Sequence, residues 1–203
     1  MRTLLLVPAV GLAAALLADP PAASQDPSAA TDLLARDLRD WTRLGDGPNP
    51  WRLTADRTLA CAAATDGFTP DREFADGTLR FEYRFRSVEG KTSYKASLSV
   101  RRQLGGTGCR VALGHGCGTV TASSQGGSDR PLEVESKPAL ELAREPGSWN
   151  LVKVQLKGRS VRVFINGRAG GSFDRCDTTR GLIVFEADGS EIEFRHITWR
   201  GDS

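Results

Sequence analysis

The sequence predicts an all-β protein folded as an antiparallel β-sandwich or jelly roll. Apolar and polar residues alternate at every second position in several segments, which is typical of half-buried strands. The chain is also rich in turn-forming residues, with 22 Gly and 10 Pro among its 203 residues. No repeat of fixed period is present, which argues against propellers and solenoids. The length fits one domain of ordinary size.

The clearest predicted strand covers residues 79–86. Its odd-numbered positions are apolar and its even-numbered positions are charged, so one face enters the core while the other is polar. The apolar face consists of Leu79, Phe81, Tyr83 and Phe85, and the charged face of Arg80, Glu82, Arg84 and Arg86.

Shorter alternations predict further strands, and turn signals separate them. Lys157–Ser160 is one such signal, and Asn166–Gly167 is of the Asn-Gly type that admits two positive φ values in a tight hairpin. Short helical segments are expected only near 33–38 and 139–144. The further strands are expected at 98–100, 111–113, 152–156, 161–165 and 192–197, the last with a slip near its end.

The first residues have the pattern of a secretory signal peptide. Arg2 precedes an apolar run, and Ala22–Ser24 supplies the small residues that suit a signal peptidase. The alternative is a membrane anchor, which needs about 20 apolar residues, but Pro8 and Asp19–Pro21 shorten the run. We therefore expect a secreted or periplasmic protein with no stable membrane anchor after cleavage. Residues 1–24 are the expected signal peptide, 25–32 a linker, and 33–203 a single jelly-roll domain.

Charge and motifs exclude several classes of protein. The formal net charge is only +2, from 27 Lys and Arg against 25 Asp and Glu, whereas a nucleic-acid binder usually concentrates basic residues. The chain contains no P-loop, dinucleotide fingerprint, G-x-S-x-G or H-E-x-x-H motif. No nucleic-acid partner is expected, and the oligomeric state stays open.

Four cysteines, Cys61, Cys109, Cys117 and Cys176, are expected to form disulfides, because an even number in an exported chain favours pairing. Sequence alone cannot choose among the three connectivities. Cys109 with Cys117 is the easiest pair, since glycines surround it, and Cys61 would then pair with Cys176. A zinc site is disfavoured because the spacing is not C-x-x-C and His115 alone does not complete a tetrad.

Several short motifs, in order along the chain, carry a resemblance. The chain resembles the secreted 3-keto-disaccharide hydrolase domain family, which implies a concanavalin-A-like jelly roll and a carbohydrate ligand. The matching segments are Asp37–Trp41, Phe74–Arg84, Gly147–Asn150, Ile165–Gly167 and Gly181–Ile197. Trp149 in the third segment is expected to fill the core rather than to form a sugar platform, because it begins an alternating strand.

The chain also departs from the family pattern. Lys95–Ser97 replaces Asn-Ser-Gly, Cys109–His115 replaces a Glu-x-Gln-x-x-Asp strand, and Glu186 and His196 replace a Gln and an Asn. These departures favour a second hypothesis, a glycan-binding or adhesion module of laminin-G-like fold without catalysis. Such modules often use calcium, although no motif here supports a calcium site, and we expect no cofactor and no metal ligands.

The activity implied by the resemblance is cleavage of 3-keto-glycosides or related glycosides. A ketone at C3 acidifies the hydrogen at C2, so a base can remove that proton, the aglycone can leave C1, and water can add. Glu186 and His115 are the expected base and acid, and Arg101 the expected stabiliser of negative charge. The expected substrate-binding residues are Glu82, Asp188, Arg195 and His196. Glu186 and Asp188 would also suit an ordinary two-carboxylate glycosidase, whose carboxyl groups lie about 5 to 10 Å apart.

Overall fold

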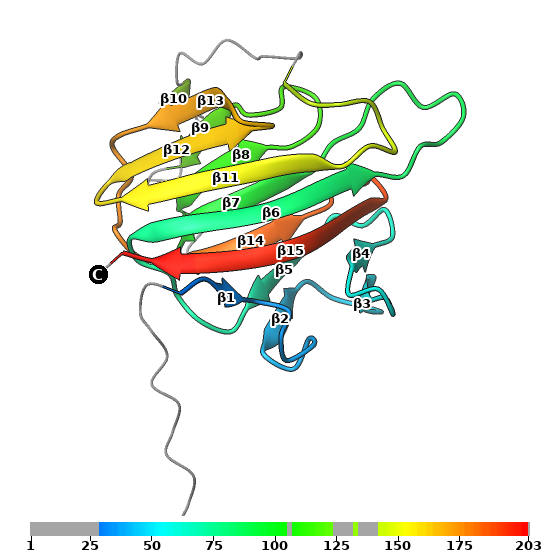
Figure 1. Cartoon of the computed structure of the whole chain (residues 1–203), viewed down its shortest axis with the longest axis horizontal. Helices are drawn as coiled ribbons and strands as arrows, with labels where there is room; N and C mark the ends of the chain where they lie inside the picture. The colour runs from blue at the N-terminus through cyan, green and yellow to red at the C-terminus, as the bar shows by residue number, and fades with distance from the viewer. Residues whose placement is uncertain (1–28, 105–106, 124–131, 134–141, 203) are drawn as a thin grey trace, which may run out of the picture.

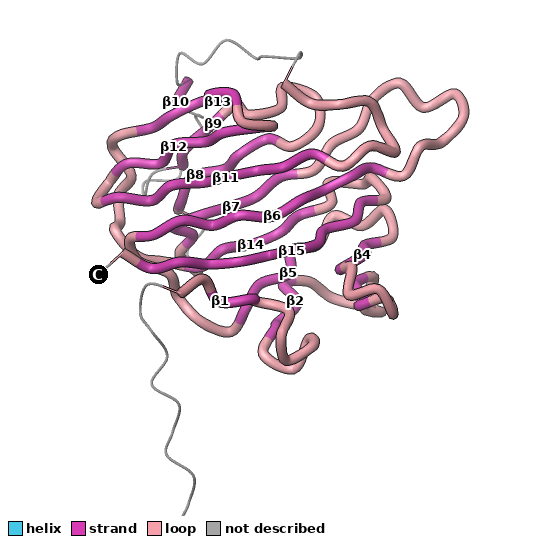
Figure 2. The backbone as a smooth tube through the Cα atoms, viewed as in Figure 1, coloured by secondary structure: helices cyan, strands magenta, loops and turns pink. Residues whose placement is uncertain are grey.

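In the computed structural model, the described residues are 29–104, 107–123, 132–133 and 142–202, and they form two antiparallel sheets that pack face to face (Figure 1). Within these residues the chain contains strands, turns and loops but no helix (Figure 2). The predicted all-β sandwich is therefore confirmed. The expected signal peptide, residues 1–24, lies outside the described residues, as does the first half of the expected helical segment at 139–144, whose described residues 142–144 are not helical.

Sheet A has eight strands. Its order across the sheet is β13-β12-β11-β6-β15-β4-β3, and the short β1 pairs with the far end of β15. The strands are β1 (Thr31–Asp32), β3 (Trp51–Leu53), β4 (Leu59–Cys61), β6 (Gly77–Phe85), β11 (Asn150–Lys157), β12 (Ser160–Ile165), β13 (Arg168–Phe173) and β15 (Ile192–Gly201). β1 includes the last two residues of the expected linker, and turns replace the helix expected at 33–38.

Sheet B has seven strands in the order β10-β9-β8-β7-β14-β5-β2. They are β2 (Trp41–Leu44), β5 (Gly67–Pro70), β7 (Ser97–Arg102), β8 (Gly108–Ala112), β9 (Val120–Ser123), β10 (Leu132–Glu133) and β14 (Leu182–Glu186). Consecutive strands pair as hairpins in β11–β13 and in β7–β10, whereas β6, β15 and β14 pair with strands that are distant in sequence, so the fold depends on long-range pairing as well as on local hairpins.

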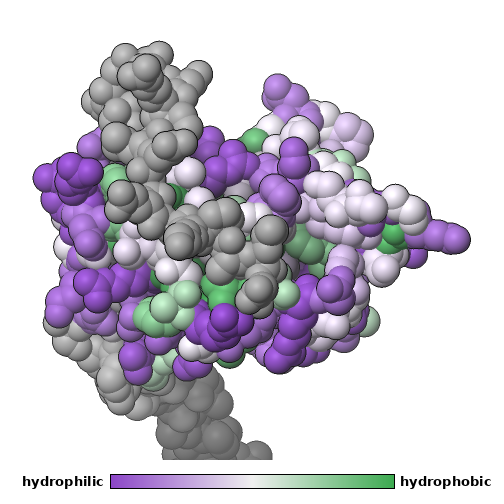
Figure 3. All heavy atoms as spheres, turned by 90° about the horizontal axis from the view of Figure 1, so that it is seen from above, coloured by the Kyte–Doolittle hydropathy of each residue, from purple (hydrophilic) through white to green (hydrophobic). Residues whose placement is uncertain are grey.

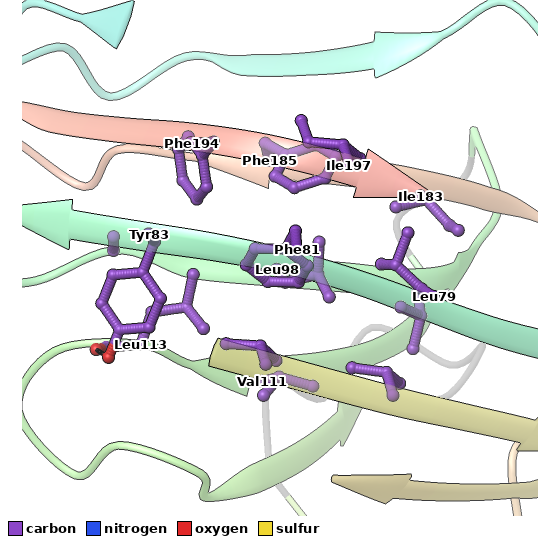
Figure 4. Packing of buried hydrophobic residues seen from close by; sticks show 14 of the residues in the cluster. Leu79, Phe81, Tyr83, Leu98, Val111, Leu113, Ile183, Phe185, Phe194 and Ile197 are labelled. Carbon is purple, nitrogen blue, oxygen red and sulfur yellow. Dashed lines mark hydrogen bonds between the residues drawn. The ribbon is translucent and has the colours of Figure 1, made fainter. Parts of the chain in front are cut away.

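The core lies between the sheets and is rich in aromatic rings (Figure 4). Phe81 of sheet A meets Phe185 of sheet B edge-on, with ring centroids 5.4 Å apart, and Phe194 packs against both rings. All three side chains are fully buried. The alternation seen in the sequence thus places one face of every long strand in this core.

Two bulges bear on the predicted site residues, one in each sheet, and a further register shift lies between β12 and β13. The register between β14 and β7 shifts beside Arg101, and the register between β15 and β6 shifts beside His196, where a slip was predicted. Both residues have positive φ, 56° and 52°. A bulge of this kind re-aims the side chains that follow it, and the first bulge decides which arginine reaches the outer face of sheet B.

The cysteines are arranged differently from the expected pairing. Cys109 Sγ lies 2.6 Å from Cys176 Sγ, while Cys117 Sγ lies 3.2 Å from the Tyr83 hydroxyl. All four cysteines are buried and present as thiols. The geometry favours Cys109 with Cys176, and the easiest pair expected from the sequence, Cys109 with Cys117, is not brought together. The Gly-rich segment between those two residues turns instead toward Tyr83.

Candidate functional site

The outer face of sheet B gathers polar side chains from three adjacent strands. Leu98, Phe185 and Val111 are directly opposite one another and point into the core. Their neighbours along each strand therefore point outward. The outward-facing side chains at the centre of the sheet are Ser97 and Ser99 of β7, Arg110 and Ala112 of β8, and Val184 and Glu186 of β14.

Glu186 is at the centre of this group, with its side chain only 12% exposed. Its Oε2 accepts hydrogen bonds from the Ser97 hydroxyl at 3.0 Å and the Ser99 hydroxyl at 2.9 Å. Its Oε1 accepts one hydrogen bond, from Arg102 Nη1 at 3.1 Å. Because a carboxylate oxygen has two lone pairs, Oε1 keeps one acceptor position for a ligand.

Arg110 connects Glu186 to Asp188. Its Nε donates to the Ser97 hydroxyl at 2.8 Å, and its Nη2 donates to Asp188 Oδ1 at 2.5 Å. Burial lowers the pKa of Arg110, but the hydrogen bond to Asp188 and the charge of Glu186 outweigh this effect and raise it. The guanidinium therefore stays charged, and Ser97 and Asp188 hold it in a fixed position in the site.

A cavity of about 250 Å³ opens beside this network and brings His115 to it. His115 follows β8 and is held by its backbone amide, which donates to the Tyr94 carbonyl at 2.8 Å. Gly114 permits this approach, because a Cβ there would lie 2.0 Å from the same carbonyl oxygen. The cavity is lined by Lys95, Ala96, Ser97, Arg110, Ala112, His115, Thr119, Thr121 and Asp188.

The structure thus brings together three of the predicted site residues. His115 and Asp188 line the cavity, and Glu186 lies next to it, bonded to Ser97. Glu186 and Asp188 are two residues apart, whereas His115 comes from a distant segment that sequence spacing could not join to them.

Arg101 lies elsewhere. Its side chain is completely buried and points away from the cavity, with Nη2 donating to Asp76 Oδ1 at 2.9 Å and to the Gly158 carbonyl at 3.0 Å. Nε and Nη1 of Arg101 have no hydrogen-bond partner among the described residues. The role expected for Arg101 at the substrate does not fit this position, and the bulge is the reason. It turns Arg101 inward, and Arg102 reaches Glu186 instead.

The other predicted binding residues form a separate group on the outer face of sheet A. Arg195 Nε donates to Glu82 Oε2 at 2.5 Å, and His196 Nδ1 lies 3.5 Å from the same oxygen. Trp149 is partly exposed and makes cation–π contacts with two guanidinium groups, with Arg195 Cζ 4.0 Å and Arg84 Cζ 4.5 Å from its ring centroid. Trp149 is therefore not a core residue, and Glu82, Arg195 and His196 do not share a cavity with Glu186.

Sequence reasoning missed Ser99, Arg102 and Arg110 as site residues. Ser99 and Arg110 could have been found by extending the alternation of their strands, since each lies next to a core residue. No signal identified Arg102, because the bulge that exposes it depends on the register between two distant strands.

Among the described residues, no three His, Cys, Asp or Glu side chains are grouped so as to hold a metal ion. The same part of the chain contains no helix that is long and apolar enough to span a membrane.

Two antiparallel sheets with a polar site on one outer face define a concanavalin-A-like jelly roll. Within this class the chain belongs to the 3-keto-alpha-glucoside-1,2-lyase-like domain family, whose model matches residues 30–200. The resemblance found in the sequence is thereby confirmed. A comparison with curated proteins finds no significant match.

Solved structures with the same fold are distant in sequence. A candidate glycosyl hydrolase from Parabacteroides distasonis is 15% identical, with a TM-score of 0.61, and the match covers 86% of this chain and 100% of that chain. A carbohydrate-binding module from Bacillus subtilis is 10% identical, with a TM-score of 0.63 and coverage of 80% and 96%. A β-glucanase from Bacillus licheniformis is 7% identical, with a TM-score of 0.53 and coverage of 88% and 100%.

Proposed function

We propose that this protein is an exported carbohydrate-active domain that cleaves 3-keto-glycosides in the cavity on the outer face of sheet B. The observation that carries the proposal is the set of connected polar groups at that cavity, Arg110, Ser97, Glu186 and Asp188, beside His115. Family membership supports the substrate class.

The reaction begins with removal of the C2 proton of the 3-keto sugar. The resulting electron pair is delocalised onto the C3 oxygen as an enolate, and its return expels the aglycone from C1, leaving a double bond between C1 and C2. Addition of water across that bond completes the hydrolysis. The site therefore needs a base, a cation for the enolate oxygen and a proton donor for the departing oxygen.

The residues of the cavity suit these three tasks. His115 is exposed in the cavity, and imidazole is the side-chain type that transfers protons near neutral pH, so we assign it to proton removal. Arg110 lines the same cavity as a charged donor and stabilises the enolate. The imidazolium of His115 then carries the proton taken from C2 and donates it to the departing aglycone oxygen. Asp188, also in the cavity lining, accepts a hydrogen bond from Arg110 and holds that guanidinium in place.

Glu186 is mainly a positioning and binding residue in this proposal. Three of its acceptor positions are occupied by Ser97, Ser99 and Arg102. The carboxylate thus holds the two serines and Arg102 in place, and the remaining lone pair of Oε1 accepts a sugar hydroxyl.

The test is release of reducing sugar from a 3-keto-glucoside by the purified protein, measured for the wild type, His115→Gln and Glu186→Gln. Loss of a proton-transfer residue should lower kcat about 100-fold or more, while Glu186→Gln should act mainly by raising KM. Glu193→Gln is the matched control, because Glu193 is also a carboxylate bonded to arginine but lies on sheet A.

The second candidate function is glycan binding without catalysis. The shielding of Glu186 and its internal hydrogen bonds favour this alternative, since they suit a group that orients a ligand rather than one that reacts. Binding of a glycoside that Glu186→Gln weakens, together with no turnover by the wild type, would establish this function and overturn the lyase proposal.

A further inference from the structure

Basic side chains gather at one end of the outer face of sheet A, opposite to the side that bears Glu186. Two adjoining hollows of about 470 Å³ and 260 Å³ share Thr78, Gln155 and Arg200 in their linings. Figure 3 shows many hydrophilic side chains at the left-hand end of the molecule, which is the end where β11 is followed by β12 in Figure 1. We define the basic cluster as the cations of the two linings, Arg80, Lys153, Lys157, Arg162 and Arg200.

Strand register places the basic cluster on one continuous surface. Gln155 is opposite both Arg162 and Thr78, and Thr78 is opposite Arg200, so this row crosses β12, β11, β6 and β15. The adjacent row contains Lys153 and Arg80. With strands about 4.8 Å apart, the row from Arg162 to Arg200 extends over about 14 Å between Cα atoms.

Within the described part of the chain, no member of the basic cluster forms an ion pair with a carboxylate, although the charge of Lys157 contributes to lowering the pKa of Asp76. Lys153 alone of these described cations has a cation–π contact, with Nζ 3.9 Å from the Phe164 ring centroid. One carboxylate, that of the exposed Asp202, is in the lining of the larger hollow.

Other arginines on or next to the same strands are, by contrast, paired with carboxylates. Arg84 pairs with Glu193, Arg86 with Glu191, and Arg195 with Glu82. The outer face of sheet A is therefore divided into a half where charges are paired and a half where positive charge is in excess. Such an excess attracts a ligand of opposite charge.

We propose that the basic cluster binds a linear anionic polysaccharide through its sulfate or carboxylate groups. Cations spread over four strands contact an extended ligand with repeated charges better than a single small anion. Between them, the hydroxyls of Thr78, Ser160 and Thr198 and the amide of Gln155 can bond to sugar hydroxyls. This site is on the other sheet from the proposed lyase cavity and does not depend on it.

An anionic membrane surface fits the cluster less well. Among the described residues of sheet A, the only large apolar side chain that is exposed is Leu151, at 38%. Leu151 is opposite Glu82 in the half where charges are paired, and it is absent from both linings. The basic cluster therefore has no apolar group to insert among lipid chains.

The test compares binding of dextran sulfate with binding of unmodified dextran of the same length, by calorimetry. The wild type should bind only the sulfated polymer, with an affinity that falls as salt rises, because exposed charges are screened. The triple variant Arg80→Gln, Arg162→Gln, Arg200→Gln should bind it at least about tenfold more weakly. The triple variant Arg84→Gln, Arg86→Gln, Arg195→Gln loses the same charge from the paired half and should bind as the wild type does.

Thermal melting of both variants verifies folding, and amide shifts of the wild type on titration should map to β6, β11, β12 and β15. Equal weakening in the two variants would show that only net charge matters and would overturn the proposal. Failure of the wild type to bind dextran sulfate at about 0.15 M salt, or binding to phosphatidylglycerol vesicles alone, would also overturn it.

Discussion

The guanidinium of Arg101 is fully buried and donates a hydrogen bond to Asp76 Oδ1 at 2.9 Å. The pair joins the two sheets, because Arg101 belongs to β7 of sheet B and Asp76 immediately precedes β6 of sheet A. Asp76 also accepts hydrogen bonds from the Gly158 amide at 2.9 Å. One carboxylate thus anchors a buried cation and a hairpin turn.

Removing that carboxylate should destabilise the fold. Asp76→Ala leaves the Arg101 charge buried without its partner, which costs about 3 kcal/mol, at the lower end of the usual range because Asp76 is 40% exposed. Urea unfolding measures the loss, with the exposed Asp202→Ala as a control that should change little. A loss below about 1 kcal/mol, the level of a surface pair, would show that the pair contributes no more than an exposed one.

The same pair should make stability depend on acid pH. The Gly158 amide first, and then Arg101, lower the pKa of Asp76 below its ordinary value of 3.8. The folded state therefore binds this proton less readily than the unfolded state, so the stabilisation is present above pH 3.8 and is lost as pH falls through the lower folded value. Subtracting the stability of Asp76→Asn from that of the wild type at each pH isolates this effect. A difference that does not shrink toward acid would contradict it.

Cys109 and Cys176 should form a disulfide when the protein is exposed to oxidised glutathione. Their sulfurs are 2.6 Å apart, and the hydrogen bond from Cys109 lowers the pKa of the Cys176 thiol. Cys176 is therefore the thiol that ionises first and attacks the disulfide of glutathione, and Cys109 then displaces glutathione from the mixed disulfide. A crosslink across 67 residues should add about 4 kcal/mol to the free energy of unfolding.

Peptide mapping without reduction identifies the bond, and Cys109→Ser or Cys176→Ser should abolish the stabilisation by glutathione. Cys61→Ser should not change the response to glutathione, because Cys61 lies on β4, away from the pair. A peptide that links Cys109 to Cys117 would refute the pairing and would restore the one that sequence proximity favours.

Alternation along the chain was sufficient to predict the long strands and the sandwich, since the faces of β6, β11 and β12 are decided locally. The short strands from 41 to 70 carry too few residues to show a period. The site was only half predictable, for a related reason. Glu186, His115 and Asp188 stand out by residue type. A bulge, however, turns Arg101 into the core and places Arg102 at the site, and a bulge cannot be seen in the alternation of one strand. The approach of Cys109 to Cys176 likewise comes from long-range packing.

Gly114 should be irreplaceable at the cavity. Its backbone passes so close to Tyr94 that a Cβ would lie 2.0 Å from the carbonyl oxygen and 2.7 Å from the carbonyl carbon. Both are backbone atoms, which cannot move away by a change of rotamer. Gly114→Ala should therefore cost about 1–3 kcal/mol, as overpacking does, and should displace His115, whose amide bonds to that carbonyl. Gly201→Ala is the matched control, because its nearest contact would be an ordinary 3.6 Å. Melting curves give the stability, and the imidazole resonances of His115 report its position. If both are unchanged in Gly114→Ala, the loop adapts and the cavity does not depend on this glycine.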